Sequence, residues 1–105
     1  MSALFSNRRK IKMGENKKDE ITMEMTIDLM DSEDYKERFK GEYAQTLIRV
    51  RKLNDMLNKY DNGTLGFTPT CPIYLLRHQS AYMEAYLKTM EERAVYENID
   101  LSFID

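Results

Sequence analysis

Two long stretches of the chain place core-type residues at the spacing of an α-helix. In residues 32–60 these positions recur at alternating steps of four and three, the heptad spacing that lines one side of a helix. The positions are Phe39, Tyr43, Thr46, Val50, Leu53, Leu57 and Tyr60. A second helix is predicted for residues 72–97, where one face carries Leu76, Met83, Leu87 and Met90. With residues 61–71 as the connecting loop, the pattern predicts an all-α fold built on a long antiparallel helical hairpin.

Residues beside the two helices indicate where each one begins and ends. Asp31 and Ser32 are the predicted caps of the first helix, because their side-chain oxygens can accept hydrogen bonds from free backbone N–H groups. Gly63 is expected to end that helix in the left-handed conformation that glycine adopts easily. The second helix is expected to begin with Thr70 or Cys71 as its cap.

Residues 20–30 carry a different pattern, in which apolar and polar residues alternate. The apolar members are Ile21, Met23, Met25, Ile27 and Leu29. Alternation is typical of a β-strand, but a lone strand would need another copy of the chain as its partner. A short helix is the alternative, and the pattern leaves both structures open. The segment belongs to a charged N-terminal arm, residues 1–31, ahead of a hairpin domain, residues 32–105.

The arm also separates its charges along the chain. Residues 1–18 hold six basic residues against a single acidic one, Glu15. Residues 19–34 hold seven acidic residues and no basic one. A solvated arm and an arm that docks on another subunit or partner by charge complementarity both fit this composition.

The apolar residues outnumber the places on the single internal face of a two-helix hairpin. Those that do not all fit on one seam are Leu47, Ile48, Met56, Leu75 and Met90. A second apolar seam favours association of copies, so we predict a homo-oligomer. The C-terminal tail is expected to pack onto a neighbouring subunit through Ile99, Leu101, Phe103 and Ile104.

Composition narrows the classes of protein that the chain can belong to. A formal net charge of −2 argues against a general binder of duplex nucleic acid. No apolar run approaches the ~18 residues of a membrane span, and the start of the chain does not resemble a signal peptide. The single cysteine, Cys71, cannot form an internal disulfide, which favours a reducing compartment such as the cytoplasm.

Signals for catalysis are weak. His78 is the only histidine, and it is expected two helical turns beyond Cys71, so a Cys–His nucleophile pair is not predicted. The spacings CxxC and HExxH, and the glycine-rich phosphate loops, do not occur in the sequence. We therefore predict a protein without enzymatic activity, metal or cofactor.

The helices do offer groups suited to a small anionic ligand such as a nucleotide. The guanidinium fork of arginine matches two phosphate oxygens, and aromatic rings stack on bases. Such groups run beside the core positions as Tyr35, Arg38, Gln45 and Arg49 on the first helix and as Gln79, Tyr82, Tyr86 and Arg93 on the second. The alternative interpretation is that the tyrosines pack at a subunit interface and that Arg93 caps its helix.

Two segments together resemble a known family: YKERFKGEYAQTLIRVRKLNDML, residues 35–57, and LLRHQSAYMEAYLKTMEERA, residues 75–94. With φ for an apolar residue, the shared pattern is Y-x-x-R-φ-x-x-E, then [KR]-φ-x-K-L-x-x-φ-L, and after a loop L-L-x-x-Q-x-x-x-M-x-x-Y-x-x-x-φ-x-x-R. It is carried by Tyr35, Arg38, Phe39, Glu42, Arg49, Val50, Lys52, Leu53, Met56, Leu57, Leu75, Leu76, Gln79, Met83, Tyr86, Met90 and Arg93. The pattern resembles that of the phage anti-CBASS cyclic-oligonucleotide sponge family and its uncharacterised phage relatives.

The resemblance implies a helical homo-oligomer, typically a hexamer, in the host bacterial cytoplasm. Its members sequester cyclic di- and trinucleotide immune signals without cleaving them. The resemblance also implies that Tyr35 stacks on a base, that Arg49 meets phosphate, and that Arg93 belongs to a second, cyclic-trinucleotide site. Gln79 and Tyr86 match the pattern, which leaves open whether they pack or bind. Two alternatives are a phage protein-binding module that inhibits a host defence protein and a helical virion assembly factor.

Overall fold

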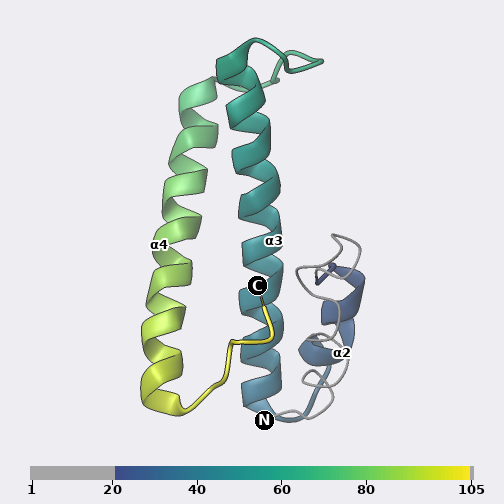
Figure 1. Cartoon of the computed structure of the whole chain (residues 1–105), viewed down its shortest axis with the longest axis vertical. Coiled ribbons are helices and arrows are strands. Elements are labelled where there is room, and N and C mark those ends of the chain that lie inside the picture. The colour runs from purple at the N-terminus through teal and green to yellow at the C-terminus, as the bar shows by residue number, and fades with distance from the viewer. Residues whose placement is uncertain (1–20, 105) are drawn as a thin grey trace.

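The computed structural model describes residues 21–104 (Figure 1). The basic residues of the arm, and their predicted docking on a partner, lie outside this range. Within it the regular elements are all helical: the 3-10 helix η2 (Glu24–Thr26) and the α-helices α2 (Ile27–Met30), α3 (Tyr35–Asn62) and α4 (Ile73–Glu97). The predicted all-α fold is confirmed for these residues. None of the helices described is both long enough and apolar enough to cross a membrane.

Helices α3 and α4 lie side by side and run in opposite directions, which confirms the predicted hairpin (Figure 1). Their shared core consists of Phe39, Tyr43 and Val50 from α3 and Leu87, Met90 and Ala94 from α4. Each of these residues is at most 7% exposed. Four positions of the predicted heptad seam, Phe39, Tyr43, Val50 and Leu57, are therefore buried on α3, whereas Tyr60 at its far end is 41% exposed.

The start of α3 differs from the prediction. Asp34 is the N-cap, and its side chain accepts a hydrogen bond from the backbone N–H of Lys36 at 3.0 Å. Ser32 instead accepts from the backbone N–H of Asp34 in a tight turn before the helix, so the predicted caps at Asp31 and Ser32 are wrong. At the other end Gly63 ends the helix with a φ of 77°, as predicted.

The start of α4 also differs from the prediction. Pro72 occupies the N-cap position without a side-chain hydrogen bond, so the predicted cap at Thr70 or Cys71 is wrong. Proline suits this place because its ring fixes φ, here −57°, close to the helical value. The helix ends at Asn98 in the left-handed conformation, where φ is 60°.

The sequence pattern left open whether this segment forms a β-strand or a short helix. The structure shows a helix, because residues 24–30 are helical. A step of four residues fits the helical period as well as the strand period, which is why Ile21, Met25 and Leu29 share a side in either structure. The helix leaves exposed two residues that a strand would bury with them. Met23 is 37% and Ile27 is 58% exposed.

This short helix is anchored on α3 by a close approach and by a buried polar contact. A Cβ atom at Gly41 of α3 would lie 2.9 Å from the Sδ of Met30 and 3.0 Å from the Cβ of Leu29, so only glycine fits without movement. Thr26 is fully buried, and its hydroxyl accepts a hydrogen bond from the side-chain amide of Gln45 at 2.8 Å. Residues 24–30 of the arm therefore belong to the folded body.

The C-terminal tail turns back and crosses α3 (Figure 1). Ile99 joins the hairpin core, and Phe103 joins a second cluster with Ile21, Leu29 and Ala44. Ile99 and Phe103 are 6% and 5% exposed. The expectation that the tail packs onto a neighbour is wrong for these residues, because their own chain buries them.

Most residues of the supposed second seam are also covered within the chain. Leu47 packs against the hairpin core and Ile48 against the second cluster. Met90 is 2% exposed, whereas Leu75 is 45% exposed. Of the residues assigned to the second seam, Leu75 at the start of α4 is therefore the one that stays exposed.

Candidate functional site

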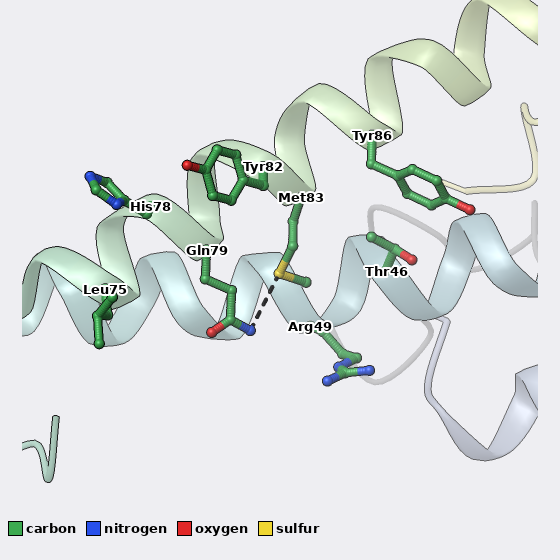
Figure 2. A pocket seen from close by; sticks show the side chains of 8 residues that line it. All are labelled: Thr46, Arg49, Leu75, His78, Gln79, Tyr82, Met83 and Tyr86. Atoms are coloured by element: carbon green, nitrogen blue, oxygen red, sulfur yellow. Dashed lines mark hydrogen bonds between the residues drawn. The ribbon is translucent and has the colours of Figure 1, made fainter.

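An open groove runs along the junction of α3 and α4, in the half of the hairpin next to the connecting loop (Figure 2). Its volume of about 650 Å³ falls in the range of small-molecule sites. The residues that line it are Thr46, Arg49, Leu75, His78, Gln79, Tyr82, Met83 and Tyr86. The groove is therefore formed by one turn of α3 and three turns of α4.

Three of the site residues predicted from the sequence meet in this groove: Arg49, Gln79 and Tyr86. The side chain of Gln79 points from α4 toward α3, and its amide nitrogen lies 3.8 Å from the Sδ of Met83 (Figure 2). The hydroxyl of Tyr86 donates a hydrogen bond to Glu42 of α3, which holds the ring across the junction. The groove thus combines a guanidinium, an amide and an aromatic face.

A ladder of rings runs along one side of α4. Tyr74, His78, Tyr82 and Tyr86 follow one another at steps of four, which places them one above the next on a helix. The ring centres of Tyr74 and His78 are 5.5 Å apart, and those of His78 and Tyr82 are 6.1 Å apart. Tyr82 is 70% exposed, so its face is open to a planar ligand.

The charge of the groove is one-sided. None of its eight lining residues is acidic, and Arg49 supplies a permanent positive charge. Glu42 is engaged by Tyr86 at the edge. Within residues 21–104, no group of three or more His, Cys, Asp or Glu side chains is arranged to hold a metal ion. The lining therefore suits an anionic ligand with aromatic rings, which Arg49 and the tyrosine rings could contact.

The other two predicted residues, Tyr35 and Arg93, meet at the opposite end of the hairpin, where α3 begins and α4 ends. Both donate hydrogen bonds to Glu97. The guanidinium of Arg93 also lies over the ring of Phe39, with 4.8 Å between its Cζ and the ring centre. These bonds lower the pKa of the Glu97 carboxyl, chiefly through Arg93 and next through Tyr35, and the bond to Glu97 raises the pKa of Tyr35.

The groove and the group formed by Tyr35, Arg93 and Glu97 lie at different levels of the hairpin. Arg93 follows Gln79 by 14 residues on the same helix, a separation of about 21 Å at 1.5 Å per residue. The same spacing of 14 residues separates Tyr35 from Arg49 on α3. The structure therefore pairs Tyr35 with Arg93 and Arg49 with Gln79 and Tyr86, as two separate sets.

Both sets of residues and the loop between their helices lie inside one stretch of the chain that matches a family model. The Sequestin model matches residues 33–96. The chain belongs to the Sequestin family. No curated protein and no solved structure matches it. Membership of the Sequestin family suggests a sequestering role.

The Sequestin match ends just before Glu97 and begins after α2. The helices inside it are held in register by polar contacts across the hairpin. Tyr43 donates to Glu91 at 2.6 Å, and burial together with this carboxylate raises the pKa of Tyr43 to about 12. Near the loop, Arg77 binds Asp61 at 2.7 Å. These contacts fix the relative positions of Arg49 and Gln79 across the groove.

Sequence reasoning missed part of the groove. It treated His78 only as a possible partner of Cys71, whereas the structure places its ring between Tyr74 and Tyr82. The signal was present in the sequence, because His78 continues the four-residue step of the tyrosines. Thr46 was assigned to the core seam, and the structure shows it on the groove side of α3, under the Tyr86 ring (Figure 2).

Proposed function

We propose that this protein sequesters cyclic di- or trinucleotide immune signals, with the α3–α4 groove as the primary ligand site. The proposal joins the sequestering role suggested by the family with the resemblance to the phage anti-CBASS sponges. Arg49 binds phosphate, Tyr82 and Tyr86 stack on bases, and the amide of Gln79 meets a base edge. The protein acts in the cytoplasm of the infected host cell.

One observation carries the proposal. Arg49, Gln79 and Tyr86 come from two different helices, and the fold brings them to a single groove of about 650 Å³. A cyclic dinucleotide needs this combination, because it presents anionic phosphates between two flat bases. The absence of acidic residues among the eight that line the groove removes the main source of repulsion for such a ligand.

The groove is open, so we propose that a second copy of the chain closes it. Tyr74, Leu75 and Tyr82 are 56%, 45% and 70% exposed beside it, which is unusual for large side chains on one helix face. A homo-oligomer, as the resemblance implies, would cover these side chains and enclose the ligand between subunits. Its predicted hexameric state is part of the same proposal.

Sequestration requires no chemical step. Tight binding lowers the free concentration of the signal, so copies of the protein must rival signal molecules in number. Binding without cleavage needs only contacts that complement the ligand. In the groove these contacts would come from Arg49, Gln79 and the tyrosine rings.

Native mass spectrometry of the full chain tests the proposal. The protein is measured alone and with a mixed panel of cyclic di- and trinucleotides and ADP-ribose-derived signals. We expect an oligomer that gains intact ligand masses in a fixed ratio. A clean oligomer that takes up nothing from the panel, or a ligand released as a cleaved product, would exclude sequestration of these signals.

A charge reversal locates the site. Arg49→Glu should abolish binding of the panel ligand and leave the oligomer intact, because it places a carboxylate where phosphate would bind. Lys88→Glu is the matched control, since Lys88 is exposed on α4 and does not line the groove. Unchanged affinity in the Arg49 variant would remove the groove from the ligand site.

The exposed ring ladder also supports a second candidate, a module that binds a host defence protein, because tyrosines are enriched in protein interfaces. The two candidates separate on deletion of residues 1–20. A sponge should still bind its nucleotide, whereas an inhibitor that docks through the charged arm should lose its partner. The deletion must stop before Ile21, because Ile21 is 6% exposed in the second cluster.

A further inference from the structure

Tyr35, Arg93 and Glu97 form a cluster at the end of the hairpin away from the connecting loop. The carboxylate of Glu97 lies at the centre of this cluster. Glu97 accepts hydrogen bonds from Nε of Arg93 at 2.7 Å, from Nη2 of Arg93 at 3.1 Å and from the hydroxyl of Tyr35 at 3.0 Å. Lys36 lies near enough that its positive charge helps to lower the pKa of Glu97. The guanidinium of Arg93 and the hydroxyl of Tyr35 therefore converge on a single anion, while the amine of Lys36 lies nearby and donates to the backbone oxygen of Asn98 at 3.5 Å.

The position of Glu97 is unfavourable for its own helix. Glu97 is the last residue of α4, where the partial negative charge of the helix end repels a carboxylate. The first residue of α3, Tyr35, stands at the positive end of the neighbouring helix. The attraction that holds Glu97 thus comes from the other members of the cluster, which form a binding place for an anion.

We infer that Glu97 is a built-in competitor, which occupies a phosphate-binding cradle formed by Tyr35 and Arg93 until a phosphoryl group displaces it. Both oxygens of the carboxylate are bound by the fork of Arg93, as two oxygens of a phosphate would be. The inference rests on the proposed function in that the displacing group belongs to a cyclic oligonucleotide.

The geometry permits the exchange. Side chains of Arg93 and Glu97 are 52% and 28% exposed, so solvent and ligand reach the pair and little stability depends on it. Asn98 follows Glu97 in the left-handed conformation, so the helix already ends there and Glu97 can turn away without breaking it. Arg93 keeps its place because its guanidinium lies on the ring of Phe39.

The competitor also confers selectivity. A monovalent anion that displaces Glu97 makes the same two charge-assisted hydrogen bonds with Arg93 that the carboxylate made. Such an anion therefore binds with little net gain in free energy. A ligand with several phosphates that is held by other contacts as well can offset that loss. Glu97 therefore lowers the affinity of the site for small anions but still allows a ligand with several phosphates to bind.

Isothermal titration with inorganic pyrophosphate tests the inference on the full chain. Glu97→Gln should bind pyrophosphate about threefold to tenfold more tightly than the unchanged protein, because the amide no longer carries the competing charge. Glu92→Gln is the matched control: it removes the same charge from an exposed position on α4 and should leave the affinity unchanged. The double variant R93Q/E97Q should lose the gain.

Two results would overturn the inference: equal affinities for the variants at Glu97 and Glu92, or a gain that persists in R93Q/E97Q. The test also stands apart from the proposed function. If the cyclic nucleotides fail to bind and the pyrophosphate gain still depends on Arg93, the competitor role holds and the choice of ligand is wrong. If Arg49→Glu abolishes nucleotide binding but Glu97→Gln gains nothing, the sponge holds and the competitor role is wrong.

Discussion

Gln45 of α3 donates a hydrogen bond from its side-chain amide to the hydroxyl of Thr26, 2.8 Å away, across the contact between α3 and the 3-10 helix η2. The same hydroxyl donates to the backbone oxygen of Met23 at 2.6 Å. Thr26 is 0% exposed, so neither bond can be replaced by water. This pair is the polar link that joins the N-terminal segment to the hairpin.

Thr26→Val should therefore lower the free energy of unfolding by about 1–3 kcal/mol, because it keeps the shape and leaves the amide of Gln45 without its buried acceptor. Urea denaturation at pH 7 measures the change. Thr68→Val in the exposed loop is the control and should stay within about 0.5 kcal/mol of the unchanged protein. Equal effects of the two substitutions would show that the link is not needed.

Gly41→Ala should destabilise the protein, although alanine favours a helix over glycine by about 1 kcal/mol. The added Cβ would meet the Cβ of Leu29 at 3.0 Å, and crowding of this kind costs about 1–3 kcal/mol. Gly66→Ala is the control, since nothing lies within 4 Å of its added Cβ. Thermal unfolding of the two variants gives the comparison. A rise in stability at Gly41 would mean that α2 moves away without loss.

Tyr82→Ala should weaken binding of the cyclic nucleotide about fivefold to a hundredfold, because a stacked base contributes about 1–3 kcal/mol. Tyr96→Ala is the matched control on the same helix, as Tyr96 is 90% exposed and does not line the groove. Isothermal titration with the ligand found by mass spectrometry measures both. If both variants lost affinity equally, the effect would not be specific to Tyr82, and stacking on its ring would be excluded.

Stability should fall at high pH through Tyr43, whose pKa is raised to about 12 by burial and by Glu91. Because the unfolded chain loses this proton near pH 10, the contribution is complete below pH 10 and is lost as the pH rises from 10 to about 12. Tyr43→Phe should flatten that part of the stability curve, whereas the exposed control Tyr96→Phe should follow the unchanged protein. Urea denaturation between pH 9 and 12 provides the measurement. Parallel curves for both variants would contradict the assignment.

The sequence was sufficient for the hairpin because two long helical periods and Gly63 leave few other arrangements. It was insufficient for residues 20–30, because a step of four between Ile21, Met25 and Leu29 satisfies both a strand and a helix. The caps were misplaced by one to three residues, and at the first helix the reason is similar. Ser32 and Asp34 both carry cap-forming oxygens, and only the turn between them decides which one accepts from the helix.

The grouping of residues in the candidate groove could be predicted only in part, for reasons of geometry. Residues on one helix face can be grouped from their spacing, so Gln79 and Tyr86 were correctly placed beside each other. Spacing does not tell how far one helix is shifted along the other. That shift pairs Tyr35 with Glu97 and brings Arg49 and Gln79 into the same groove, and it is set by contacts such as Tyr43 with Glu91. The pairing of Arg93 with Glu97 follows from their spacing on one helix, but the contact of Tyr35 with Glu97 could not be seen before the shift was known.

The second cluster has a consequence for the order of folding. Ile21 and Phe103 are members of the same cluster, yet they are 82 positions apart in the chain. The hairpin closes a loop of about ten residues, and the entropy lost in closing a loop grows with its length. We therefore expect the hairpin to form first and the segments around Ile21 and Phe103 to pack over it in the last step. The contacts within this cluster would then determine how cooperatively residues 21–104 unfold.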